Sequence, residues 1–305
     1  NGFIEVTTAN GDVIVDRPVA HAGNGSVRLT ANGADGDIVI NESVVSLSNF
    51  VRLQAQDDVV QNGVVASGNN GYLVVTAGDD ITMGSSALGF TGSGNILYSA
   101  NDQVTVNNLI TSNGNISVLA GGDILQRSNI VSLVNGSIDV QSTGGSITML
   151  DGTIALVGPN RDIRYSANNN IFLSSLISTQ GDVSVRSVTG SILDGGNALP
   201  DIIGRNVMLS APNGGIGQLG AGADALELAA TNIAARAGSG GINLAIGGDV
   251  TVGTVGAGVS VNRVGTSGGT TPINDGSISG YTTTGGGSIV QVGNGTATIN
   301  APISA

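Results

Sequence analysis

Apolar and polar residues alternate along this chain in a phrase that returns about every 22 residues. The phrase opens with glycine, alternates polar with aliphatic residues, reaches a small residue, and passes through a Gly/Asn/Asp turn into a second alternating run. A fixed step of this length is typical of a solenoid, in which each unit buries its apolar face only against its neighbours. The copies begin at Gly2, Gly25, Asn49, Gly71, Gly94, Gly114, Gly136, Arg161, Gly181 and Arg205.

Each copy contains three short runs of alternating residues, which in the copy from Gly71 lie at 73–77, 81–83 and 88–90. Alternation over so few residues predicts half-buried strands, and Val, Ile and Leu suit a pleated surface. We therefore expect an all-β fold: a right-handed parallel β-helix (β-solenoid) with three strands per coil, about 22 residues per coil and about 12–13 coils. At about 4.8 Å per coil, this stack would be a rod on the order of 60 Å long.

Two positions of the phrase predict which side chains point inward. The third position is aliphatic, and we expect one buried ladder formed by Ile96, Val118, Ile138, Ile163 and Val183. The seventh position never exceeds threonine in size, which marks a corner where a larger side chain would overpack the wall. The alanines that we expect to pack inward at this corner are Ala77, Ala100, Ala120 and Ala167.

The chain divides into two regions that differ in how regularly the phrase repeats. Residues 1–220 carry regular β-helix repeats, and residues 221–305 are a looser Gly/Ala/Thr-rich continuation of the β-helix. Residues 191–204 contain extra turn residues and a proline, which predicts a bulged loop. Residues 265–287 are poor in apolar side chains and predict either a flexible loop or an atypical coil.

Charge and composition narrow the possible partners. The chain has ten basic residues, all of them arginine, and a net charge of −12, whereas nucleic acids and anionic membranes bind clustered cations. We expect no nucleic-acid partner, and no membrane insertion, because no apolar stretch approaches the ~18 residues of a spanning helix.

Cysteine is absent, so neither disulfides nor cysteine metal sites hold the fold. Since the chain begins without Met or a signal peptide, we read it as a segment of a longer protein or a processed mature form.

The candidate metal ligands are two acidic pairs, Asp57–Asp58 and Asp79–Asp80, which lie 22 residues apart in equivalent turns. One coil apart, these carboxylates would stack, and like charges at such a distance raise each other's pKa or recruit a cation. Weak calcium binding is therefore possible for these four residues, and no other cofactor is expected. Turns also favour Asp, Asn and Gly for backbone reasons alone, which is the simpler interpretation.

The sequence offers no recognisable catalytic constellation. The single histidine, His21, has no marked Ser or Asp partner, and no Gly-Lys-Ser/Thr phosphate loop is present. We therefore expect no enzymatic activity. A polysaccharide-active β-helix enzyme is a remote alternative that rests on fold analogy alone.

Four of the arginines suggest a surface that could bind an acidic ligand. Arg28 and Arg52 come from consecutive copies, as do Arg164 and Arg186, and all four are predicted at the outward fourth position of the first strand. Each pair could stack and hold an acidic ligand or a partner's carboxylate. The alternative is that they are solvated charges that discourage aggregation of the sheet.

The phrase resembles the shaft repeats of filamentous haemagglutinin-like bacterial adhesins and exoproteins, best in GNISVLAGGDILQ, GSIDVQSTGGSITM and GDVSVRSVTGSIL. The likeness covers roughly residues 1–220 well and the remainder loosely. It implies a structural or adhesive rod segment of a large secreted or cell-surface bacterial protein, exported by two-partner secretion or a related route. The implied localisation is extracellular, and the implied partner is a host or neighbouring-cell receptor or glycan.

A second functional hypothesis follows from solenoid geometry. A coil stack exposes unpaired strand edges at its ends unless these are capped. No polar helical cap is visible at either terminus of this sequence. The chain could therefore be a subunit of a self-assembling extracellular fibre or sheath whose copies stack end to end.

Overall fold

The computed structural model describes residues 2–196, 200–256 and 259–305 of the chain. All regular elements of these residues are β-strands. They fall into two compact units, described one at a time: unit 1 comprises Asn1–Asp139 and Asn262–Thr271, and unit 2 comprises Val140–Val261 and Pro272–Ala305. Within the described residues, no helix is long and apolar enough to cross a membrane.

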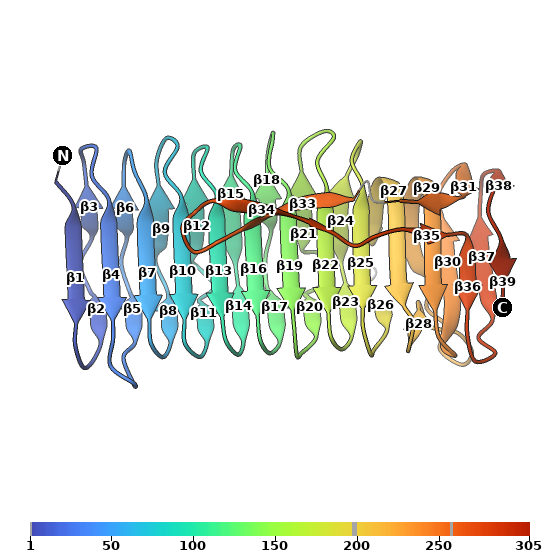
Figure 1. The fold of residues 1–305 in the computed structure, drawn as a ribbon, viewed down its shortest axis with the longest axis horizontal. Coiled ribbons are helices and arrows are strands. Elements are labelled where there is room, and N and C mark those ends of the chain that lie inside the picture. Colours follow the sequence, from blue (N-terminus) through green and yellow to red (C-terminus); the bar gives the residue numbers. More distant parts are fainter. Residues whose placement is uncertain (1, 197–199, 257–258) are drawn as a thin grey trace. The chain divides into compact units, whose positions relative to one another are not determined.

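Unit 1 is a parallel β-solenoid with three strands per coil (Figure 1). The first strands are β1 (Ile4–Thr8), β4 (Val27–Ala31), β7 (Val51–Ala55), β10 (Leu73–Ala77), β13 (Ile96–Ala100) and β16 (Ile116–Ala120). The second strands are β2 (Val13–Val15), β5 (Ile38–Ile40), β8 (Val59–Gln61), β11 (Ile81–Met83), β14 (Val104–Val106) and β17 (Ile124–Gln126). The third strands are β3 (Val19–His21), β6 (Val44–Ser46), β9 (Val64–Ser67), β12 (Leu88–Thr91), β15 (Asn108–Thr111) and β18 (Ile130–Ser132).

Unit 2 has the same coil plan, but two of its strands, β27 (Ile202–Ala211) and β29 (Leu226–Ala237), are longer than those of unit 1. Its shorter strands are β20 (Ile147–Met149), β21 (Ile154–Val157), β22 (Ile163–Ala167), β23 (Ile171–Leu173), β24 (Ser175–Ser178), β25 (Val183–Ser187), β26 (Ile192–Asp194) and β28 (Gly215–Ile216), and β19 (Ile138–Ser142) begins in unit 1. Its later strands are β27 (Ile202–Ala211), β29 (Leu226–Ala237), β30 (Gly241–Ile246), β31 (Val250–Val252), β36 (Tyr281–Thr283), β37 (Ile289–Gly293), β38 (Ala297–Ile299) and β39 (Ile303–Ser304).

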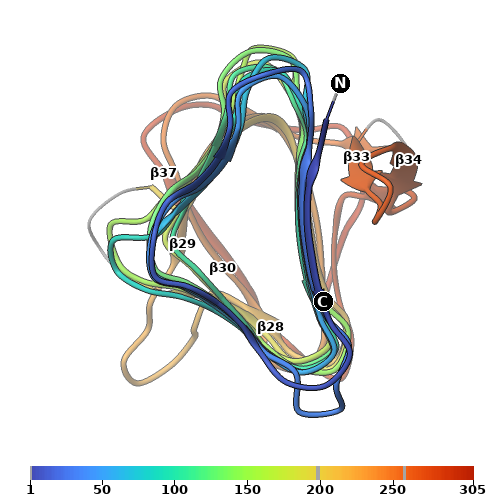
Figure 2. The same ribbon diagram turned by 90° about the vertical axis from the view of Figure 1, so that its left-hand side faces the viewer.

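The pairing confirms the predicted all-β parallel solenoid, with turns of about 23 residues. In unit 1, β10 pairs in parallel with β13, and β11 pairs in parallel with β14. In unit 2, β22 pairs in parallel with β25. The coils of each unit trace a three-sided outline when seen end-on (Figure 2). Together the described residues contain about 13 turns.

The five residues predicted for the buried ladder are all fully buried. One was assigned to the wrong rung, because Ile96 lies opposite Ile116, and Val118 lies opposite Tyr98 two positions further along. Gly114 opens that copy, so Ile116 is its third residue and Val118 its fifth. Both positions face inward because strand side chains alternate with a period of two, so the error changed the rung and not the face.

The corner prediction is confirmed. Ala77, Ala100 and Ala120 lie opposite one another at the ends of β10, β13 and β16, and each is buried, as is Ala167. The glycine at the first position of the phrase is also explained by close contact between successive coils. A Cβ atom on Gly114 would collide with the carbonyl oxygen of Gly94 one coil earlier.

A hydroxyl ladder, which the sequence analysis did not predict, fixes the corner after the third strands β6, β9, β12, β15 and β18. The Oγ atom of Ser132 donates to the Gly114 carbonyl at 2.9 Å and accepts from the Gly136 N–H at 3.1 Å. Thr111 makes the same pair of bonds to Gly94 and Gly114. Each hydroxyl therefore joins two coils and closes the turn that opens the next copy of the phrase.

Of the two alternatives predicted for residues 265–287, a flexible loop or an atypical coil, the structure shows a coil that carries an insertion. Residues 253–256 and 259–280 belong to this insertion between β31 and β36, because Val252 lies opposite Ile233 and the coil resumes with Tyr281 opposite Ala235. The insertion contains an antiparallel pair, β32 (Thr254–Val255) with β35 (Ile278–Ser279), and a two-stranded sheet, β33 (Ser260–Val264) with β34 (Thr270–Asn274). Figure 2 shows β33 and β34 outside the three-sided outline.

The insertion covers outward side chains of the first strands in each unit. In unit 1, Val264 packs against Val74 and Leu97, and its N–H donates to the Ser117 Oγ at 2.8 Å. Arg263 forms an ion pair of 2.6 Å with the fully buried Asp139. Side chains that the alternation assigns to solvent are therefore buried beneath this hairpin.

In unit 2, the same insertion rests on an apolar patch and an ion pair. Val255 and Val259 pack with Met208 and Ala234, which face outward from β27 and β29. Arg164 donates through Nε to the Asp275 carboxylate at 2.8 Å, and both side chains are almost fully buried. The bulged loop predicted at 191–204 includes residues 197–199, which lie outside the described residues.

We predict that Ala100→Leu destabilises the protein by roughly 1–3 kcal/mol, because its neighbours on both adjacent coils are alanines and the corner has no room for a larger side chain. The measurement is the urea midpoint of unfolding. Ser99→Leu is the matched control, since Ser99 lies opposite Leu119 and already tolerates a leucine beside it. Equal midpoints for the two variants would contradict the corner assignment.

We also predict that Arg263→Ala destabilises unit 1 by up to about 3 kcal/mol, because Asp139 would keep a buried charge without this ion-pair partner. The hairpin tip at Gly265–Gly269 should become more sensitive to limited proteolysis. Arg127→Ala is the control, since Arg127 is exposed, and its effect should stay within about 0.5 kcal/mol. If both variants are digested at the wild-type rate, Arg263 does not anchor the hairpin.

Candidate functional site

The two acidic pairs predicted from the sequence come together on adjacent coils of unit 1. One carboxylate oxygen each from Asp57, Asp58 and Asp79 lies within 4.8 Å of the others, and Asp79, Asp80 and Asp102 form a second such group. Asp79 and Asp102 are exposed and the other three are half-buried. The negative charge of Asp80 is the main cause that raises the pKa of Asp79. The predicted stacking is therefore present, and calcium binding at these residues stays a prediction.

These acidic turns also have a structural task. The Oδ1 atom of Asp58 accepts from the N–H of Asp80 at 2.9 Å, and the Oδ1 atom of Asp80 accepts from the N–H of Gln103 at 2.7 Å. Asp37 makes the same bond to the N–H of Asp58 at 3.0 Å. Each carboxylate satisfies a backbone donor of the next coil, which explains an acidic or amide residue here without any ligand.

His21 takes part in a turn. It ends β3, and its Nδ1 atom accepts from the N–H groups of Gly23 at 3.2 Å and Gly25 at 3.3 Å. Its register partner on the next coil is Ser46, whose hydroxyl belongs to the corner ladder. The histidine thus replaces a hydroxyl in the first copy of the phrase.

The two arginine pairs behave differently. Arg28 and Arg52 lie opposite each other as predicted. The prediction for the second pair is wrong, because Arg164 lies opposite Ser184 and Arg186 lies opposite Ser166. Arg186 is the sixth residue of its copy rather than the fourth.

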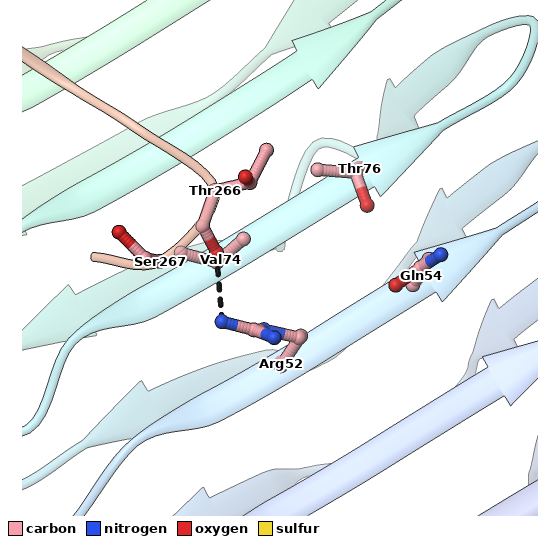
Figure 3. Close-up of a pocket in the computed structure, with 6 residues that line it drawn as sticks. All are labelled: Arg52, Gln54, Val74, Thr76, Thr266 and Ser267. Atoms are coloured by element: carbon pink, nitrogen blue, oxygen red, sulfur yellow. Dashed lines mark hydrogen bonds between the residues drawn. The ribbon is translucent and has the colours of Figure 1, made fainter. Parts of the chain in front are cut away.

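Arg52 lines a groove of about 340 Å³ in unit 1 (Figure 3). Its guanidinium lies against the stacked rings of Phe50 and Tyr72, and its Nη2 atom donates to the Thr266 carbonyl at 2.7 Å. The other lining residues are Gln54, Val74, Thr76 and Ser267. Amide, hydroxyl and guanidinium groups in such a groove can hydrogen-bond to a sugar or a carboxylate.

The most enclosed acidic group was missed by the sequence analysis and lies in unit 2. One carboxylate oxygen from each of Asp194, Asp201 and Glu227 lies within 4.8 Å of the other two. Asp201 is fully buried, and the other two are half-buried. The Oδ2 atom of Asp201 accepts from the Glu227 N–H at 2.8 Å, and the Oδ1 atom of Asp194 accepts from the Gly196 N–H at 2.8 Å.

Burial dominates the electrostatics of this group. It raises the pKa values of Asp201, Asp194 and Glu227, and the negative charge of Asp194 adds to the effect on the other two. The charges of Asp224 and Asp151 also raise the pKa of Asp194. The available sequence signal was the coil step itself, because Ile202 lies opposite Leu228 and so sets Asp201 beside Glu227.

No family model, no curated protein and no solved structure matches this chain.

We predict that Asp201→Asn changes the pH dependence of stability in buffer containing EDTA. Since the folded pKa of Asp201 is raised, its contribution is fully present below the pKa of an unfolded aspartate and is lost as the pH rises through the folded value. The wild-type urea midpoint should therefore fall between about pH 5 and about pH 8, and the variant's should fall less. Asp249→Asn, at an exposed aspartate of unit 2, is the control and should follow the wild type. Identical pH profiles for wild type and Asp201→Asn would refute the burial argument.

Proposed function

We propose that this chain is a structural and adhesive rod segment of a large bacterial cell-surface or secreted protein. The observation that carries the proposal is the use of the phrase itself in both units. Its aliphatic positions fill the interior, its small position forms a corner, and its polar turn residues bond to the next coil. A sequence devoted to coil-to-coil contacts suits a spacer that extends by adding repeats.

Adhesion would use the outward surface of such a rod. The groove beside Arg52 offers amide, hydroxyl and guanidinium groups, which can hydrogen-bond to a surface glycan or an acidic side chain. The resemblance of the repeats to filamentous haemagglutinin-like shafts supports an extracellular, cell-surface location. The expected partner is a receptor or glycan on a host or neighbouring cell.

A self-assembling fibre or sheath is the second candidate, and the exposed apolar side chains of the outermost coils favour it. Phe3 and Ile14 in unit 1 and Ile299 and Ile303 in unit 2 are large and exposed. Either a second copy or further coils of a longer chain would cover these edges. A polysaccharide-active enzyme remains the remote alternative.

Sedimentation and negative-stain electron microscopy of the purified chain separate the first two candidates. We expect single elongated particles at moderate concentration. Filaments that disappear in Ile299→Glu would establish the fibre instead. Leu133→Glu is the control for that variant, since Leu133 is equally exposed but lies away from the edge strands.

A screen against neutral and acidic polysaccharides tests adhesion and catalysis together. We expect binding without cleavage, and a loss of binding in Arg52→Ala. Thr105→Ala, a half-exposed threonine of β14, is the control and should bind like the wild type. Shortened polysaccharide products that are absent from an Asp57→Asn/Asp80→Asn variant would overturn the rod proposal in favour of an enzyme.

A further inference from the structure

The acidic group of unit 2 differs from the acidic turns of unit 1 in its unpaired atoms. The Oδ2 atom of Asp194, the Oδ1 atom of Asp201 and the Oε2 atom of Glu227 are each shielded from solvent, and none has a hydrogen-bond partner in the described residues. A carboxylate oxygen without water or a donor loses its solvation with no compensation. Three such carboxyl groups close together need either a shared proton or a positive partner to offset their repulsion.

The protein itself supplies no such partner among its described residues. None of the ion pairs found there involves Asp194, Asp201 or Glu227. The charged groups that face the cluster from neighbouring elements are Asp151 and Asp224, which are also acidic. The surroundings therefore add negative potential and no counter-charge.

The chemistry of the three carboxyl groups favours calcium. Calcium takes carboxylate oxygens at ~2.3–2.6 Å in flexible coordination geometry, and one oxygen from each of the three residues lies close to the other two. Magnesium demands ~2.0–2.1 Å and near-octahedral geometry, and it usually keeps several of its water molecules. An all-carboxylate set also lacks the nitrogen and sulfur ligands that zinc prefers.

Two of the ligands are already held in place. The Asp201 side chain is fixed by the Glu227 N–H, and the Asp194 side chain is fixed by the Gly196 N–H. The two coils that carry Asp201 and Glu227 are locked in register by the pairing of β27 with β29. Little side-chain ordering remains to oppose binding.

We propose that Asp194, Asp201 and Glu227 form a calcium-binding site that ties adjacent coils of unit 2 together. The site is distinct from the exposed residues Asp57, Asp58, Asp79 and Asp80, and it does not depend on the proposed function of the chain. Calcium would offset two of the three negative charges and keep the coil step between β27 and β29 closed.

Isothermal titration of the full chain with CaCl₂, after removal of metals with EDTA and at neutral pH, tests the proposal. We expect one saturable site in the wild type. Both Asp201→Asn and Glu227→Gln should weaken calcium binding at least about tenfold, because each removes a charged ligand while preserving its shape. Circular dichroism would reveal a folding defect of the Asp201 variant. In that case the Glu227 variant still tests the proposal, because Glu227 is only half-buried.

The matched control is the double variant Asp57→Asn/Asp79→Asn, which removes charge from the exposed turns of unit 1 only. It should bind calcium like the wild type. Thermal unfolding adds a second readout, since CaCl₂ should raise the Tm of the wild type by several degrees, more than equimolar MgCl₂, and should leave that of Glu227→Gln nearly unchanged. No saturable binding, or binding lost only in the unit 1 double variant, would overturn the proposal.

Discussion

Parallel pairing between equivalent residues of successive coils is the constraint on which this structure depends. In such a stack each side chain meets its own counterpart about 4.8 Å away, so every position of the phrase must be compatible with a copy of itself. Aliphatic residues satisfy this condition by packing into ladders such as Ile96 with Ile116. Small residues satisfy it at the corner, where Ala77, Ala100 and Ala120 stack on successive coils.

Polar residues meet the same condition by bonding along the stack. A hydroxyl such as Ser132 joins the carbonyl of one coil to the N–H of the next, and Asp58 receives the N–H of Asp80. Carboxylates are the exception, because two of them cannot stack without repulsion or a counter-ion. Exposed turns relieve that repulsion through water, whereas the enclosed group of Asp194, Asp201 and Glu227 has no such outlet.

The insertion between β31 and β36 changes the character of the face that it covers. A solenoid face normally presents polar side chains to solvent, but Val74, Leu97, Met208 and Ala234 are apolar outward residues that need a cover. Within each unit the hairpin supplies it and adds an arginine–aspartate pair, Arg263 with Asp139 and Arg164 with Asp275. Hydrogen bonds add to these ion pairs, among them those from the Ser260 N–H to Asp162 and from the Val264 N–H to Ser117.

The sequence by itself determined the local rules of this protein, because a period of two within strands and a step of about 22 residues between copies leave one arrangement for the apolar positions. It therefore predicted the parallel solenoid, the alanine corner and the meeting of Asp57, Asp58, Asp79 and Asp80. The sequence analysis misplaced Val118 and Arg186 by two positions along their strands. An error of two positions assigns the side chain to the correct face of the strand but to the wrong partner on the neighbouring coil. Only the tertiary structure decided where residues 253–256 and 259–280 go and that Asp194 joins Asp201 and Glu227. The insertion and Asp194 lie outside the regular phrase, so periodicity carries no information about their contacts.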